Sequence, residues 1–479
     1  MDTTRKITLA VVCIATAMLM LDIAVVNTAI PSIAKDLHAD MSGVQWVVDA
    51  YTLALASVVL TAGSLADRLG RRRLFAVGLG IFTVASLGAA LADSVAVLNT
   101  ARAVQGIGGA IMFAVSLALL AHAFPSPRER ASALAAYGAT IGASFAVGPL
   151  VGGALTSGLD WRWIFLVNIP IGLLCLAGTF RGVEESRDPN ARSIDWLGQA
   201  VLGAGLFLLV LGLLRGNEDG WTSAPIVAEL GGAVALLVAF VLVERRTREP
   251  MLPLGHFRIR AFTGAQVAAF AISGSFFAVY LYATLYLQNV LGMSAVDSGL
   301  AYLPSTVLMF VVAGASAQLL ERVRPAVMIG GGLMLVALGM LVMSAMIGPD
   351  SSWTATLPGM LLAGVGTGLF NPAVSGVALN SLPDEQSGLA AGANDTFRQA
   401  GIAVGIAGLG ALIPSSAALG QDPGAFVDGL QNALIVGATL AAAGAVVATH
   451  LLRRVRVPAA SGAAEPTAVG ASVPCPEPA

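Results

Sequence analysis

Three ionisable side chains interrupt otherwise apolar stretches near the start of the chain. Asp22 lies in AMLMLDIAVVNTAI, Asp49 in QWVVDAY and Arg102 in RAVQGIGG. If each stretch is a helix that rises about 1.5 Å per residue, the three groups lie about 12, 8 and 10 Å from helix ends on one side of a membrane. A charged side chain at such depth costs roughly 2.5–3.5 kcal/mol. The pattern therefore predicts a buried cluster with a function.

The chemistry of this cluster is proton exchange. Burial disfavours an ionised carboxylate, whereas a nearby guanidinium favours it. A rearrangement around Arg102 can therefore change whether Asp22 or Asp49 carries a proton. The alternative is a static ion pair that only holds helices together, but such a pair leaves the second carboxylate uncompensated. We interpret the three residues as a proton-coupling site.

Composition predicts that membrane-spanning helices position these residues. Of 479 residues, 56% are hydrophobic and 11% are charged, against about 25% charged in an average soluble domain. The net charge of −2 offers no basic surplus for nucleic acid. The four histidines are dispersed, and no metal-ligand spacing, Walker loop or nucleophile elbow occurs. We therefore expect no catalytic residue, no metal, no cofactor and no enzyme.

Fourteen apolar runs have the length that a spanning helix needs, about 20 residues. They cover residues 7–30, 44–66, 74–92, 96–121, 130–157, 161–180, 194–214, 224–244, 261–288, 297–320, 325–347, 353–380, 388–413 and 431–452. With a cytoplasmic N-terminus, inner segments hold 21 of the 26 Lys and Arg residues, outer loops hold three, and Arg102 and Arg398 lie inside runs. Because basic residues favour the cytoplasmic side, both termini are predicted to be cytoplasmic, in a multi-pass protein of a bacterial inner membrane.

An internal repeat divides the chain. GIGGA at Gly106 recurs as GVGTG at Gly364, and SALAA at Ser132 recurs as SGLAA at Ser387. Two parallel six-helix halves around a central cavity would produce this order. We predict an N-terminal half over 1–180, two inserted helices with linkers over 181–260, a C-terminal half over 261–457, and a disordered tail over 458–479.

The stretch GSLADRLGRRRLF resembles the loop signature of the major facilitator superfamily. An ordinary positive-inside loop is the alternative, but the G-x-L-A-D-R-x-G-R-R spacing is far more specific than a count of charges. In that family the loop acts as a latch whose ion pairs break and form as the two halves rock. The resemblance assigns this latch to Gly63, Asp67, Arg68, Gly70 and Arg71.

A second stretch, YGATIGASFAVGPLVGG, resembles the antiporter motif of exporters in the superfamily. Its small residues permit close helix packing, which is also the alternative reading. The motif comprises Gly138, Gly142, Gly148, Pro149, Gly152 and Gly153.

Two further strings narrow the resemblance. WRWIFLVNIPIG and LDIAVVNTAIP resemble the 14-spanner drug/proton antiporters of EmrB/QacA type, although Ala24 stands where that family usually has Thr. In physical terms, the aromatic residues of the first string suit an interfacial belt. In the family, the helix 1 acid and the helix 4 arginine, here Asp22 and Arg102, belong to the proton-coupling half.

The second half lacks this charge arrangement, because Met360 occupies the repeat position of Arg102. Its predicted first helix carries Tyr282, Tyr286 and Asn289 on one face, with Ser275 further along. Such a face suits amphiphilic, often cationic molecules, and an interfacial tyrosine belt is an equal alternative. We predict a substrate cavity lined by Asn27, Trp46, Gln105, Tyr282, Tyr286, Asn289 and Asn394.

Two charged residues near the cytoplasmic side of the predicted helix 13, Asp395 and Arg398, form either a gate or a structural brace. Glu229, in the second inserted helix, has no role that the sequence assigns; it lies near the outer third of that helix, from which its side chain can extend toward the membrane surface.

The sequence as a whole predicts an all-α major facilitator fold of 14 transmembrane helices. The function implied by the resemblance is export of drugs, antibiotics or similar amphiphilic small molecules by proton antiport, with the proton gradient as the energy source. Its partners would be the substrate, protons and the lipid bilayer, and the protein would work as a monomer. The alternative is a proton-coupled exporter or facilitator of an endogenous metabolite such as a siderophore, an amino acid or a lipid.

Overall fold

The computed structural model describes residues 3–187, 194–319, 322–383, 386–414 and 422–455, and this described part is helical without strands. The predicted tail over 458–479 lies outside it. The first half comprises α1 Thr3–Asp36, α2 Met41–Leu69, α3 Arg71–Ala90, α4 Val95–Ala123, α5 Pro127–Gly158, α6 Trp163–Leu166 and α7 Asn168–Gly182. The insert comprises α8 Trp196–Asp219 and α9 Ala224–Arg246.

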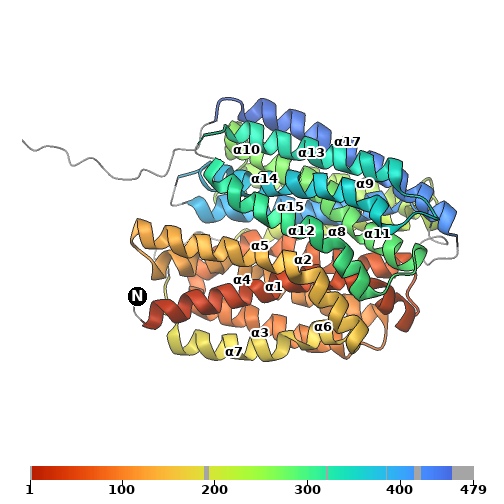
Figure 1. Cartoon of the computed structure of the whole chain (residues 1–479). Coiled ribbons are helices and arrows are strands. Elements are labelled where there is room, and N and C mark those ends of the chain that lie inside the picture. Colours follow the sequence, from red (N-terminus) through yellow and green to blue (C-terminus); the bar gives the residue numbers. More distant parts are fainter. Residues whose placement is uncertain (1–2, 188–193, 320–321, 384–385, 415–421, 456–479) are drawn as a thin grey trace, which may run out of the picture.

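The second half begins with a short turn, η1 Leu254–Arg258, and a helix interrupted by wider turns: α10 Arg260–Ile272, η2 Ser273–Phe277, α11 Ala278–Leu285 and η3 Tyr286–Val290. It continues with α12 Ala295–Leu319, α13 Pro325–Met346, η4 Trp353–Thr356, α14 Leu357–Leu379, α15 Ser387–Gly410 and α17 Pro423–Leu452. Figure 1 shows the two halves side by side along the length of the bundle.

Each of the fourteen predicted runs falls on a helical segment. Twelve segments within the described residues are long and apolar enough to cross a membrane. The other two runs correspond to α5 and α15. The polar NDTFRQ stretch lowers the mean hydropathy of α15. Large apolar side chains such as Val84, Leu174 and Val446 are exposed around the bundle, as contact with lipid requires. Fourteen crossings remain a prediction.

Several helices begin where the sequence supplies a cap. Asp40 accepts a hydrogen bond from the Gly43 N–H at 2.7 Å and starts α2, and Asp195 does the same for the Gly198 N–H of α8 at 2.7 Å. Such side chains satisfy N–H groups that have no partner within the helix. Asp422 caps α17 in the same way, so this helix begins at Pro423 and not at residue 431 as predicted.

The two halves repeat one packing pattern. α4 packs on α2 and α3, and α14 packs on α12 and α13. At the repeated glycines, Gly108 approaches the backbone of Gly78, and Gly366 approaches that of Gly332. The halves meet where α2 packs on α15 and where α5 packs on α12.

Two glycines of the predicted antiporter motif serve two different contacts, and the surroundings of Gly142 lie outside the described part of the structure. A Cβ atom on Gly152 would lie 2.8 Å from the Val25 Cα of α1, and one on Gly153 would lie 2.9 Å from the Val296 Cα of α12. α5 therefore packs closely against α1 in its own half and against α12 in the other half. Gly138 faces open space instead.

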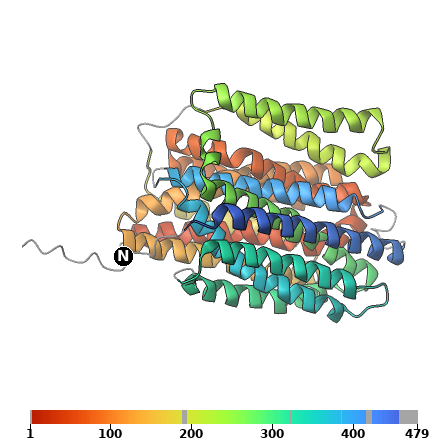
Figure 2. The same cartoon turned by 90° about the horizontal axis from the view of Figure 1, so that it is seen from above.

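The inserted hairpin α8–α9 lies at one side of the bundle (Figure 2), where α8 packs against both α2 and α15. The Thr61 hydroxyl of α2 donates to Gln199 Oε1 at 2.5 Å. Asn217 Nδ2 donates to the carbonyl oxygen of Ala411, just past α15. Within the hairpin, Glu229 forms an ion pair with Arg215 at 2.5 Å.

Candidate functional site

A buried ion pair joins α1 to α4 in the first half. Arg102 Nη1 lies 2.5 Å from Asp22 Oδ2, and each residue is only 1% exposed. The Arg102 Nε atom also donates to the backbone carbonyl of Val47 in α2 at 3.0 Å. The guanidinium carbon lies 4.3 Å from the centre of the Tyr51 ring, close enough for a cation–π contact.

Amide and hydroxyl groups complete the surroundings of Asp22. Its Oδ1 atom accepts hydrogen bonds from Gln105 Nε2 at 2.8 Å and from Asn168 Nδ2 at 3.0 Å. Ser86 Oγ accepts from Gln105 Nε2 at 2.9 Å, and Gln105 Oε1 accepts from Arg102 Nη1 at 2.7 Å. Helices α1, α3, α4 and α7 thus meet in one closed polar network.

Asp49 lies outside this network. It is fully buried, and neither carboxylate oxygen has a hydrogen-bond partner. The structure therefore brings Asp22 and Arg102 together as predicted and leaves Asp49 apart. One turn before it, Gln45 Nε2 donates to the Tyr282 hydroxyl of α11 at 2.8 Å. Asp49 thus lies near the boundary between the two halves.

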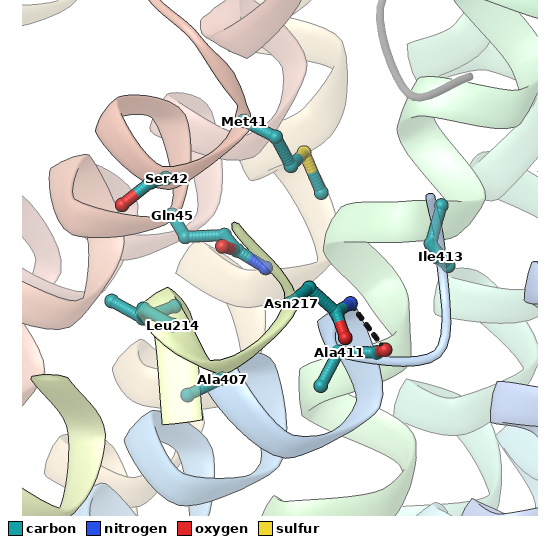
Figure 3. Close-up of a pocket in the computed structure, with 9 residues that line it drawn as sticks. Met41, Ser42, Gln45, Leu214, Asn217, Ala407, Ala411 and Ile413 are labelled. Atoms are coloured by element: carbon teal, nitrogen blue, oxygen red, sulfur yellow. Dashed lines mark hydrogen bonds between the residues drawn. The ribbon is translucent and has the colours of Figure 1, made fainter. Parts of the chain in front are cut away.

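The Gln45–Tyr282 contact links the halves at the end of the bundle opposite the N-terminus. The Tyr282 hydroxyl donates in turn to the carbonyl of Ile406 in α15. Beside this contact is a small solvent-open hollow between α2, α8 and α15. Figure 3 shows its lining residues, which are Met41, Ser42, Gln45, Leu214, Asn217, Ala407, Gly410, Ala411 and Ile413.

The predicted stripe of Tyr282, Tyr286 and Asn289 does not form one uniform polar face. It assumes a continuous α-helix, whereas η2 and η3 are wider π-helical turns, which change the rotation per residue. Tyr282 bonds across the two halves, but the Tyr286 hydroxyl donates to the Gly348 carbonyl within its own half at 2.8 Å. Ser275, inside η2, donates to backbone carbonyls of its own helix.

Other predicted cavity residues have different surroundings. Trp46 lies against Phe207 of α8, with ring centres 5.5 Å apart. Asn394 donates to Gln266 Oε1 of α10 at 3.1 Å. Asn27 donates to a carbonyl of its own helix, from Ile23, at 3.3 Å. Gln105 belongs to the Asp22 network instead of a cavity wall.

Asp395 and Arg398 do not form an ion pair. Arg398 Nη1 donates to Asn371 Oδ1 of α14 at 3.2 Å, and Asp395 Oδ2 is buried without a hydrogen-bond partner. The side-chain contact of Arg398 links α14 and α15, which fits the brace, and the choice between gate and brace stays a prediction.

The predicted latch forms a compact turn between α2 and α3. Arg71 Nε and Nη2 both donate to Asp67 Oδ1, at 3.0 and 2.8 Å. Gly70 adopts a φ of 111°, a conformation that side chains other than glycine rarely take. Arg68 is exposed at the end of α2, and a Cβ atom on Gly63 would meet open space.

The comparisons with known proteins decide the family. The model of the Major Facilitator Superfamily matches residues 12–406. The chain belongs to this superfamily. It is 36% identical to the puromycin resistance protein pur8 of Streptomyces alboniger, over 97% of this chain and 94% of that one. It is also 36% identical to the multidrug resistance protein Stp of Mycobacterium tuberculosis, over 86% and 76% of the two chains.

Solved structures agree on the fold. A peptide transporter POT bound to sulfate superimposes with a TM-score of 0.66 at 15% identity, covering 93% of this chain and 95% of that one. The human organic anion transporter MFSD10 gives 0.59 at 15% identity, over 92% and 100%. The predicted all-α major facilitator fold is confirmed, and the protein is a multi-pass membrane transporter of this superfamily, not an enzyme.

Within this major facilitator protein, sequence reasoning missed Asn168 as a partner of Asp22, and Ser86 as a further member of the network. Asn168 lies in WRWIFLVNIPIG, for which the sequence indicates only an aromatic belt and a family resemblance, and Ser86 lies in the mostly apolar helix α3. The same string holds Trp161, which is 3% exposed and donates to Asp36 Oδ2 at 3.0 Å. An uncharged polar residue just inside an apolar run was the available signal for Asn168.

Proposed function

We propose that this protein exports drugs or similar amphiphilic small molecules by alternating access, in exchange for protons. The Asp22–Arg102 pair carries the proposal. A buried ion pair is weak evidence for stability, because desolvation offsets much of the attraction. Ionisable groups inside membrane helices are costly and mark proton relays and transport pathways.

The names of similar proteins support the substrate class. Stp is named for multidrug resistance and pur8 for puromycin resistance, and a further relative from Streptomyces glaucescens, 35% identical, is a tetracenomycin C resistance and export protein. All three come from bacteria. We also propose a location in a bacterial inner membrane, both termini in the cytoplasm, fourteen crossings of the EmrB/QacA type, and action as a monomer. The excess of Lys and Arg in the predicted inner segments supports the orientation.

Two acids in different environments provide the coupling. Both oxygens of Asp22 accept hydrogen bonds, which is the pattern of an ionised carboxylate. Asp49 has no partner, and burial of an unpaired charge is costly, so a proton on Asp49 fits its surroundings. A rearrangement within the first half that separates Arg102 from Asp22 would change which acid holds a proton.

The proposed energy source is the proton gradient, without a cofactor. One proton that crosses about 100 mV releases roughly 2.3 kcal/mol. At about 1.4 kcal/mol per factor of ten, this sustains roughly a fifty-fold gradient of a neutral substrate.

An uncoupler added to intact cells tests the proposal. Efflux of a fluorescent amphiphile should stop when the proton gradient collapses while ATP remains available. Everted vesicles would then identify substrates, since each transported compound should dissipate an imposed pH gradient. Efflux that continues at its normal rate after full collapse of the gradient would contradict proton antiport.

A further inference from the structure

The geometry points to Glu185, in the segment after α7, as a positioning residue of the latch turn. Sequence reasoning placed the latch entirely between Gly63 and Arg71. The structure adds a carboxylate from more than a hundred positions further along the chain. The role of Glu185 in transport rests on the proposed function. Its contacts with the latch turn do not depend on that proposal.

Glu185 binds the start of α3 through both backbone and side chains. Its Oε1 atom accepts a hydrogen bond from the Arg72 N–H at 3.1 Å. Its Oε2 atom lies 3.6 Å from Arg73 Nε and 3.9 Å from Arg72 Nε. The next residue adds a backbone contact, because the Ser186 carbonyl accepts from the Arg71 N–H at 2.9 Å.

The start of α3 requires such a group. Three arginines, Arg71 to Arg73, occupy the first turn, which has no acidic residue of its own, and the N-cap Gly70 offers no side chain. The N-terminus of a helix carries partial positive charge, so cations there are unfavourable and a carboxylate is favourable. Glu185 supplies that carboxylate from outside the helix.

Gly70 makes this approach possible. A Cβ atom at position 70 would lie 2.6 Å from Glu185 Oε1, so a side chain there would displace the carboxylate. The glycine thus serves the tight turn and also leaves space for Glu185. Each role gives a reason for glycine at this position.

The arrangement divides the latch charges into two groups. Asp67 holds Arg71, and Glu185 holds Arg72 and Arg73 against the segment that leaves α7. Because α7 also packs on α3, Glu185 attaches the turn to the body of the first half. Arg68 is exposed on this turn, and neither Asp67 nor Glu185 pairs with it in the contacts given above.

Amide hydrogen exchange of the full chain in detergent tests the positioning directly. In Glu185→Ala, protection in the peptide spanning residues 67–75 should fall about tenfold, since the Arg72 amide loses its acceptor. Glu185→Gln keeps an acceptor oxygen but no charge and should give a smaller loss. Glu184→Gln is the matched control, because Glu184 is exposed, and it should leave protection unchanged. Unchanged protection in Glu185→Ala would overturn the inference, whether or not the protein exports drugs.

Transport rates test whether the position matters in the cycle. Glu185→Ala should lower the maximal rate about tenfold, with little change in the substrate concentration for half-maximal rate, as expected when a conformational step slows. Adding Asp67→Asn should then cost less than it does alone, since both changes act on one turn. A normal rate despite lost protection, or fully independent effects of the two substitutions, would overturn the role of Glu185 in the latch. If the protein is not a proton antiporter, the wild-type protein will show this in the transport assay, and the amide hydrogen exchange result will still test the contacts of Glu185.

Discussion

The two halves share a backbone arrangement but differ in their charges. In the first half, α4 carries Arg102 into a closed network with Asp22. In the second half, α14 packs in the corresponding way and carries Met360, which is buried, at the same repeat position. In the same half, Asp395 and Arg398 form no ion pair, and Arg398 contacts Asn371 instead. The comparison shows that both halves share close glycine packing, while a buried acid–arginine ion pair occurs, among the described residues, only in the first half.

The largest effect should come from making the first half resemble the second. Arg102→Met leaves the Asp22 carboxylate buried without its counter-charge, which costs about 3–5 kcal/mol of stability. Thermal unfolding in detergent should show a large decrease in Tm. Adding Asp22→Asn should restore most of it, because no buried charge is then left alone. A single variant as stable as the wild type would contradict the structural account of this pair.

The next effect concerns coupling. Asp22→Asn keeps the shape and some hydrogen bonds but cannot exchange a proton. It should fold and bind substrate, yet lose accumulation against a gradient, while Asp22→Glu should keep part of it. Asp36→Asn, at the far end of the same helix, is the control in the same vesicle assay. Uphill pumping by Asp22→Asn at the normal rate would make Asp22 structural and move the coupling role to Asp49.

A smaller effect is expected at the contact between the halves. Tyr282→Phe removes the hydroxyl that bonds to Gln45 and Ile406, and one neutral hydrogen bond contributes about 0.5–1.5 kcal/mol. The equilibrium constant between conformations closed and open at this end should shift about two- to tenfold toward the open one. The rate of thiol labelling at Ser42→Cys would measure this shift. Tyr286→Phe is the control, since Tyr286 bonds only within its own half in the contacts described above. Equal labelling in both variants would show that the Tyr282 contact does not hold this end closed.

The smallest effect is expected at the latch turn. Asp67 and Arg71 are partly exposed, and exposed ion pairs contribute about 0.2–1 kcal/mol. Asp67→Asn should therefore leave folding and substrate binding nearly intact and slow turnover a few-fold. Asp93→Asn, an exposed acid at the opposite end of α3, should have no effect. A normal transport rate in well-expressed Asp67→Asn would argue against the latch.

Much of the fold follows from local sequence. Hydropathy located every long helix of the described residues, since a spanning helix must be long and apolar wherever it packs. The predicted start of α17 was late because the cap at Asp422 was overlooked. The Asp22–Arg102 pair was also predictable, because two opposite charges at similar depth on apolar helices have few other ways to be stabilised.

Only the tertiary structure decided which polar groups meet. The sequence by itself determined an all-helical membrane protein with a repeat, a latch turn and two opposite charges, Asp22 and Arg102, that are stabilised by pairing. It could not show that Asp49 lies apart from the ion pair or that Tyr282 and Tyr286 bond to different halves. It also could not show that Asn168 and Glu185 contact residues far away in the chain. The physical reason is range: hydropathy and capping act within one helix, whereas a hydrogen bond between helices depends on their rotation and depth, which the packing of the whole bundle sets.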